Sequence, residues 1–170
     1  SELTTILLCI SGWVCSAMWH VIVLTSINYM GGVEFQIWAR GLSNAHAVFL
    51  DTRGRSFGLS AHTLPSARSL GEPLSSRFGI QPGEKFLWTL CGPAEQKIVL
   101  ASSFGYGFVT QLGNLHSRMK AGKAALTVPA GSVPATPALV QADKESTLVC
   151  ATSDGYLLAF PLEDVPELSK

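Results

Sequence analysis

The stretch Ile98-Val-Leu-Ala-Ser-Ser-Phe-Gly-Tyr106 decides the fold, because the same pattern occurs four times along the chain. Each copy consists of an apolar strand, a two-residue polar step, a glycine and a large side chain. The glycines lie 42, 51 and 50 residues apart. A repeat with this period is typical of an array of small β-sheets and not of one irregular core. The four copies span Thr5–Trp13, Ala47–Arg55, Ile98–Tyr106 and Leu148–Tyr156, and their glycines are Gly12, Gly54, Gly105 and Gly155.

The register continues beyond each glycine. Ten residues on, the last three copies have an aliphatic residue, and seventeen residues on, two copies have a second glycine. In the first copy this second glycine is Gly32, and in the fourth it would fall beyond Lys170. We therefore expect a single domain over residues 1–170, with repeats at approximately 1–44, 45–94, 95–145 and an incomplete 146–170. The aliphatic residues are Leu64, Leu115 and Val165, and the second glycines are Gly71 and Gly122.

The residues inside each repeat favour strands. Segments such as Ile98-Val-Leu-Ala are rich in β-formers, and the strand after the turn alternates, which predicts one buried face. Gln81-Pro82-Gly83 and Pro129-Ala130-Gly131 predict tight turns. No window longer than about ten residues keeps a helical period. The sequence therefore predicts an all-β, propeller-like array of four-stranded blades that forms a partial or open ring.

Positive charge is concentrated in the middle of the chain. The composition is 47% hydrophobic and only 14% charged, with a formal net charge of zero, so nothing global demands a nucleic acid partner. Residues 53–123, however, hold nine basic and three acidic side chains, a local net charge of +6. The second and third repeats are therefore the place to look for an anionic ligand.

The N-terminal region has the opposite character, because Leu3 to Val33 contains no charged residue. A membrane helix over residues 3–27 is therefore a rival interpretation, but the repeat alignment predicts strands there. Without a preceding basic region, the segment also does not resemble a signal peptide. The four cysteines lack paired spacing, which predicts buried free thiols and a reducing compartment. These cysteines are Cys9, Cys15, Cys91 and Cys150.

Several long motifs resemble one known family. They include Ala101-Ser-Ser-Phe-Gly-Tyr-Gly-Phe-Val-Thr and Asn114-Leu-His-Ser-Arg-Met-Lys-Ala-Gly-Lys-Ala, together with Thr63-Leu-Pro-Ser-Ala-Arg-Ser-Leu-Gly and the ending Phe160-Pro-Leu-Glu-Asp-Val-Pro-Glu-Leu-Ser-Lys. Over essentially its whole length the chain resembles the C-terminal domain of the DNA topoisomerase IV A subunit (ParC), which is related to the gyrase A C-terminal domain. A basic, glycine-rich box typical of gyrase is missing, which favours topoisomerase IV.

The resemblance implies a β-pinwheel, a propeller-like array whose blades exchange strands with their neighbours. It also implies an outer rim that binds and bends duplex DNA and positions it for strand passage by an ATP-dependent type II topoisomerase. The implied partners are duplex DNA and the rest of the A subunit, through which the chain is linked to the B subunit, in the bacterial cytoplasm near the nucleoid. The family commonly has basic residues where this chain has Cys15 and Met18, and a small residue at Trp19, which argues against DNA contact by the first blade.

DNA binding by a rim needs Lys and Arg side chains spaced to meet phosphates. Arg118 lies thirteen residues after its glycine and Arg68 fourteen, so the two could share one edge. For Arg55 we also consider packing of its stem over the blade, because Trp13, Tyr106 and Tyr156 occupy the same repeat position and are expected to pack between blades. The predicted DNA-binding residues are Arg55, Arg68, Arg77, Arg118, Lys120, Lys123 and Lys170.

Signals for catalysis are weak. Cys9, Cys15 and His20 could supply three zinc ligands, but a fourth is missing. No P-loop, nucleophile elbow or paired-carboxylate motif occurs, so we expect no catalytic residue, metal or cofactor in this chain. The rival hypothesis is a propeller-like protein interaction module without DNA binding. It is suggested by the low charge and by Trp19, Trp38 and Trp88.

Overall fold

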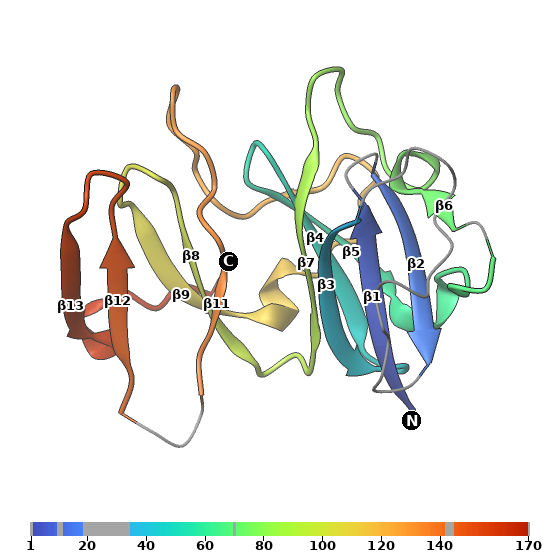
Figure 1. Ribbon diagram of the computed structural model, residues 1–170, viewed down its shortest axis with the longest axis horizontal. Helices are drawn as coiled ribbons and strands as arrows, with labels where there is room; N and C mark the ends of the chain where they lie inside the picture. The colour runs from blue at the N-terminus through green and yellow to red at the C-terminus, as the bar shows by residue number, and fades with distance from the viewer. Residues whose placement is uncertain (1, 10–11, 19–34, 70, 142–144, 170) are drawn as a thin grey trace.

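The computed structural model describes residues 2–9, 12–18, 35–69, 71–141 and 145–169 (Figure 1). In this described part of the chain the regular elements are β-strands and short 3-10 turns. The first sheet has the strand order β3-β1-β2-β6, and all its pairs are antiparallel. Its strands are β1 (Leu3–Cys9), β2 (Trp13–Met18), β3 (Phe35–Leu42) and β6 (Glu72–Pro73).

Three further antiparallel sheets follow along the chain. The second has the order β10-β5-β4-β7, the third β11-β8-β9, and the fourth is the hairpin β12-β13. The strands of the second sheet are β4 (His46–Asp51), β5 (Arg55–Ser60), β7 (Phe86–Gly92) and β10 (Lys123–Ala124). Those of the third and fourth are β8 (Lys97–Ala101), β9 (Gly107–Gln111), β11 (Ala138–Leu139), β12 (Thr147–Ala151) and β13 (Leu157–Pro161).

Neighbouring repeats exchange short strands. β6 follows the β4–β5 hairpin in the sequence but pairs with β2 of the first sheet, where Glu72 lies opposite Val14. In the same way β10 follows the β8–β9 hairpin but pairs with β5, where Lys123 lies opposite Ser56. Each of these repeats therefore completes the sheet that precedes it. This strand exchange is the β-pinwheel arrangement that the resemblance implies; the first two sheets have the four strands of a blade, the third has three and the fourth has two.

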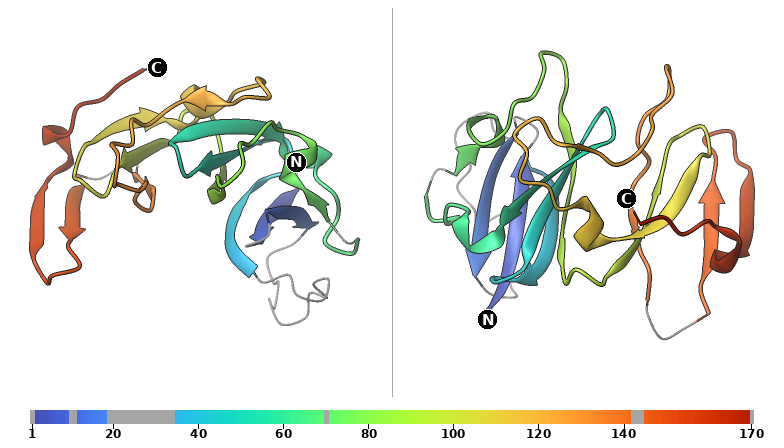
Figure 2. Two further views of the ribbon diagram at one scale, coloured as in Figure 1. Left: turned by 90° about the horizontal axis from the view of Figure 1, so that it is seen from above. Right: turned by 180° about the vertical axis from the view of Figure 1, so that it is seen from behind.

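The sheets follow an open arc. Figure 2 shows the first sheet at one end of the arc and the β12–β13 hairpin at the other, with no closed barrel between them. In the left view of Figure 2, the gold segment that contains β10 lies along the convex side. The strand exchange therefore takes place on the outer periphery of the arc.

Glycines with a left-handed backbone mark the repeats. The four repeat glycines have φ of 80, 76, 87 and 92°, and the second glycines Gly71 and Gly122 have 74 and 75°. At Gly54 the reason is clear, because its N–H donates to the Asp51 carbonyl at 3.2 Å and its own carbonyl accepts from Ala125 and Leu126 at 3.0 and 2.9 Å. The turn therefore serves as the docking point for the next repeat. Gly32 lies outside the described residues.

The core consists of two layers, one on each side of the second sheet. One cluster joins the first and second sheets, and the other joins the second and third. Strand β4 contributes to both, with Phe49 in the first cluster and Val48 and Leu50 in the second. In β9, Phe108, Val109 and Thr110 are all buried. The expected alternation with a single buried face is therefore wrong for the inner blades, because a neighbouring sheet covers each side.

The β12–β13 hairpin lies outside this core, and two expectations fail there. Cys150 is exposed, whereas the sequence predicts four buried thiols; Cys9, Cys15 and Cys91 are buried as expected. The reason is that no described residue packs across the hairpin's outer surface, so Leu157 is 72% exposed.

Tyr106 and Tyr156 do not pack between blades, contrary to the expectation. They are 69% and 73% exposed. In the second sheet the equivalent turn is covered by Ala125 and Leu126 of the next repeat. At the turn that contains Tyr106, the N–H of Ser103 donates to the Val133 carbonyl at 2.7 Å, and the tyrosine side chain nevertheless stays exposed.

Residues 3–9 and 13–18 form strands, as the repeat alignment predicts. Among the described residues, no helix has the length and apolar character that a membrane span requires. Part of the candidate membrane segment, residues 19–27, lies outside the described residues.

A substitution at Gly122 tests the strand exchange. A Cβ on this residue would lie 2.6 Å from Cζ of the buried Phe57, in addition to the strain of φ +75°. Gly122→Ala should therefore lower the free energy of unfolding by about 2–4 kcal/mol, measured by urea denaturation. Gly83→Ala is the matched control, because Gly83 has φ +86° and nothing within 4 Å of an added Cβ. It should cost about 1–2 kcal/mol, and equal losses for both variants would contradict this packing.

Candidate nucleic-acid interface

A loop from the next repeat covers the outer edge of the second strand in each of the first two hairpins. In β2, the N–H of Ser16 donates to the Pro65 carbonyl at 2.7 Å, and the Ser16 carbonyl accepts from Ala67 at 2.6 Å. In β5, the N–H of Gly58 donates to the Ser117 carbonyl at 3.0 Å. We call these backbone contacts clasps. Each clasp lies on the same strand edge as the exchanged strand β6 or β10.

A third clasp covers β9. The N–H of Val109 donates to the Pro166 carbonyl at 2.9 Å, and the Val109 carbonyl accepts from Leu168 at 2.8 Å. This clasp uses the backbone N–H and carbonyl of Val109 in the same way as the first clasp uses those of Ser16, although the two residues have different side chains. Because backbone groups make the clasps, the same loop position is fixed in three successive repeats.

The first two clasps lead into loops of one geometry. We call residues 66–71 the first basic loop and residues 117–122 the second basic loop. In the first, the N–H of Arg68 donates to Oγ of Ser66 at 3.2 Å. In the second, the N–H of Met119 donates to Oγ of Ser117, also at 3.2 Å. By this serine contact Arg68 corresponds to Met119, although the clasp acceptors, the carbonyls of Pro65 and Ser117, are one residue out of that register. Lys170, which follows the third clasp, lies outside the described residues.

Three of the candidate residues are free to meet an anion. Arg68, Arg118 and Lys120 are exposed on the two basic loops. Within the described ranges, none of them forms an ion pair with a carboxylate. Carboxylates of the described residues therefore leave these charges unneutralised, and both loops present cations at corresponding places.

Arg77 is engaged inside the first blade. Its Nε lies 2.7 Å from Oε1 of Glu72, and its Nη2 donates to the Thr63 carbonyl at 3.0 Å. Arg77 therefore links Glu72 of the short strand β6 to Thr63, which precedes the first basic loop. Its charge is largely balanced by Glu72, so its role in this structure is to hold the loop in place.

Arg55 and Lys123 hold the second basic loop. Nη1 of Arg55 donates to the Ala121 carbonyl at 3.1 Å, and Nζ of Lys123 donates to the Asn114 carbonyl at 2.7 Å. Both residues are only partly exposed. The alternative interpretation of Arg55, with its side chain packed over the blade, agrees with this contact.

Two stacked histidines lie where the second basic loop begins. The rings of His46 and His116 have centroids 3.8 Å apart and planes at 34°. The backbone of Gly58 lies so close to the His116 ring that an added Cβ would overlap Nδ1. Nδ1 itself is buried without a hydrogen-bond partner. Burial, with smaller effects of His46 and Arg118, lowers the pKa of His116, which therefore holds the loop as a neutral ring.

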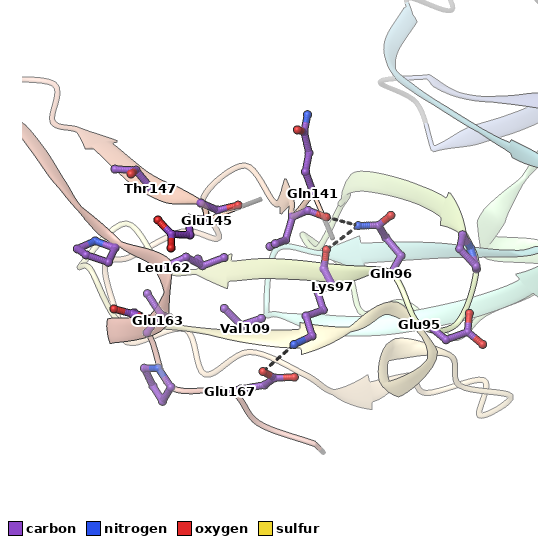
Figure 3. A pocket seen from close by; sticks show the side chains of 16 residues that line it. Glu95, Gln96, Lys97, Val109, Gln141, Glu145, Thr147, Leu162, Glu163 and Glu167 are labelled. Carbon is purple, nitrogen blue, oxygen red and sulfur yellow. Dashed lines mark hydrogen bonds and ion pairs between the residues drawn. The ribbon is translucent and has the colours of Figure 1, made fainter. Parts of the chain in front are cut away.

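A cleft between the third and fourth sheets has the opposite charge (Figure 3). Its volume is about 1040 Å³, and its lining includes Glu95, Glu145, Glu163 and Glu167. Among the described lining residues the one lysine is Lys97, which pairs with Glu167 at 3.0 Å. An acidic cleft repels phosphates, so this concave feature does not suit DNA.

No metal-binding constellation is found among the residues that the structure describes. There, no three His, Cys, Asp or Glu side chains lie close enough to hold a metal ion. Burial raises the pKa of Cys15 to about 11, with a smaller effect of Cys9, so the thiol is protonated at neutral pH. His20, the third candidate ligand, lies outside the described residues.

The histidine pair predicts a pH dependence of stability. As pH falls below about 6.5, the unfolded chain binds a proton at His116 before the folded chain does, so the free energy of unfolding should decrease. His116→Asn should reduce the decrease in the free energy of unfolding between about pH 7.5 and about pH 5.5, measured by urea denaturation. His62→Asn, at an exposed site, is the control. If the free energy of unfolding decreases as much in the His116 variant as in the native chain, this assignment is contradicted.

No family model matches the chain, but curated relatives do. The A subunit of DNA topoisomerase 4 from Pseudomonas aeruginosa is 42% identical over 170 residues, and that from Escherichia coli K12 is 40% identical over 170 residues. These alignments cover 100% of this chain and 22% of each relative. The chain therefore spans about a fifth of the length of the relatives it matches.

Solved structures give the same result at the level of the fold. The E. coli ParC C-terminal domain is similar with a TM-score of 0.92 and 40% identity, covering 100% of this chain and 69% of that chain. The DNA gyrase A C-terminal domain, at 13% identity and a TM-score of 0.68, covers 99% of this chain and 58% of that chain and shares the fold. Because of its sequence identity to these relatives and its exchanged strands, the chain belongs to the family of C-terminal domains of the DNA topoisomerase IV A subunit.

Proposed function

We propose that this chain binds duplex DNA with its two basic loops and bends it around the convex side of the arc, without itself catalysing a reaction. One observation carries the proposal: equivalent clasps present the unpaired cations Arg68, Arg118 and Lys120 in successive blades. Phosphates that such cations neutralise release counterions, which supplies affinity without sequence preference.

The arrangement also supports bending. Cations that follow the outside of an arc attract phosphates at successive points, and a duplex must curve to reach all of them. Smooth bending of a short duplex by 40–90° costs about 1–6 kcal/mol, which several phosphate contacts can offset. The net charge of zero does not oppose this, because the acidic residues of the cleft lie between other sheets.

The relatives supply the context of the proposal. They are A subunits of topoisomerase IV, so the partners of this chain would include the rest of the A subunit, which in turn would link it to the B subunit. In the bacterial cytoplasm, at the nucleoid, the domain would position a duplex for strand passage by the ATP-dependent enzyme. We assign no cofactor to this domain. Lys170 would extend the same surface at the third clasp.

A protein interaction module is the second candidate. The observation that favours it is the exposed apolar surface of the β12–β13 hairpin, with Val149, Leu157 and Leu158 at 55%, 72% and 60% exposure. The tryptophans that first suggested it do not add to this surface. Trp88 packs against the second core cluster, and the side chains of Trp19 and Trp38 lie outside the described structure.

Salt-dependent DNA binding separates the two candidates. Replacing both Arg118 and Lys120 with alanine should weaken binding of the 170-residue chain to duplex DNA about tenfold or more. It should also reduce the log-log salt slope by about 1.8, because each lost phosphate contact removes about 0.9. Fluorescence anisotropy at several salt concentrations measures both quantities.

The control is a double variant with the same loss of charge, Arg53→Ala with Lys97→Ala. Arg53 pairs with Glu84 at 2.9 Å and Lys97 pairs with Glu167 at 3.0 Å, so in each case a carboxylate competes with a phosphate for the cation. The control should keep the native slope within about 0.5. Equal effects of the two double variants would reject the basic loops as the binding surface, and a slope near zero for the native chain would reject DNA binding by charge.

A further inference from the structure

Met119 is an apolar side chain that the second basic loop exposes between two cations. It is 57% exposed, and its neighbours Arg118 and Lys120 are exposed as well. A group of this kind becomes useful when the bound partner offers an apolar surface beside its negative charges.

The backbone holds Met119 in a fixed place. Its N–H donates to Oγ of Ser117 at 3.2 Å, and its carbonyl accepts from the N–H of Gly122 at 3.0 Å. The next carbonyl, that of Lys120, accepts from the N–H of Gly79 at 2.8 Å. The loop is therefore pre-organised, and presenting the side chain to a partner costs little conformational entropy.

The corresponding position in the first basic loop is occupied by Arg68. Both residues donate their N–H to a serine Oγ two positions earlier, at 3.2 Å in each loop. Arginine and apolar side chains can both enter the minor groove of DNA. Arginine enters narrow minor grooves because of their negative potential, and apolar side chains enter between base pairs from the minor groove and kink the duplex.

We infer that Met119 enters the minor groove of the bound duplex as an apolar wedge at a base-pair step, while Arg118 and Lys120 hold the flanking phosphates. The inference rests on the proposed DNA binding and adds a means of bending to it. Arg68 inserts into the minor groove at the neighbouring blade. Methionine also occurs on surfaces that bind peptides, but the two unpaired cations beside Met119 favour a polyanion.

The test compares Met119→Gln with Leu139→Gln in the 170-residue chain. Glutamine keeps the length of methionine and removes its apolar end, and Leu139 is a matched control because it is 59% exposed on β11. The probe is a short duplex with 2-aminopurine in place of the adenine at one central T–A step, a flexible step, and with a dye pair at its two ends. Unstacking raises the 2-aminopurine fluorescence, and bending raises energy transfer between the dyes.

We expect the native chain and Leu139→Gln to raise both signals on binding. Met119→Gln should still bind, with an affinity lower by about tenfold or less and an unchanged salt slope, but it should lose most of the 2-aminopurine signal and part of the energy transfer. Urea denaturation midpoints equal to that of the native chain would show that both variants are folded.

Two outcomes would overturn the wedge, and they differ. If Met119→Gln binds and gives the native 2-aminopurine signal, Met119 does not enter the duplex, although the proposed DNA binding stands. That result would leave a protein partner as the reason for the exposed methionine. If the native chain does not bind the duplex, the proposed function fails and this inference fails with it.

Discussion

The outer edge of the second strand in each hairpin is the feature on which the rest of this structure depends. Such an edge exposes unpaired N–H and carbonyl groups. In β2 and β5 the next repeat satisfies them twice, first with a short exchanged strand and then with a clasp. Backbone groups make most of these contacts, and side chains add to them, since Oγ of Ser16 donates to the Pro65 carbonyl and Arg55 and Lys123 hold the second basic loop. The two basic loops therefore occupy corresponding places, although their side chains differ.

This constraint explains how a chain with no net charge can present a cationic surface. The clasps bring Arg68, Arg118 and Lys120 to corresponding places of neighbouring blades, whereas the glutamates of the third and fourth sheets line a separate cleft. The two signs of charge are thus separated in space although they balance in number. The local field, and not the net charge, determines which face attracts a polyanion.

The sequence was sufficient for the repeat and for the fold, because the left-handed glycines leave a direct mark at a fixed period. The sequence could not show which candidate cations are exposed and which bond to carbonyl groups of the protein. Arg55 and Lys123 are half-buried and donate to the carbonyls of Ala121 and Asn114, whereas Arg118 is exposed, and the sequence does not show which carbonyls lie within reach of a side chain. Burial of Cys150 was predicted wrongly for a related reason. A strand pattern shows that a side chain can be buried, but it does not show whether another sheet covers it.

The central claim is that the two basic loops lie against one DNA duplex. Cysteines introduced as Ser69→Cys and Ala121→Cys in a Cys150→Ser background would each carry a photoactivated cross-linker, since the three other native cysteines are buried. The account predicts that the doubly labelled chain cross-links through both loops to a single duplex, in a complex of one chain and one DNA molecule. Cross-linking through one loop only, or of two duplexes by one chain, would contradict it.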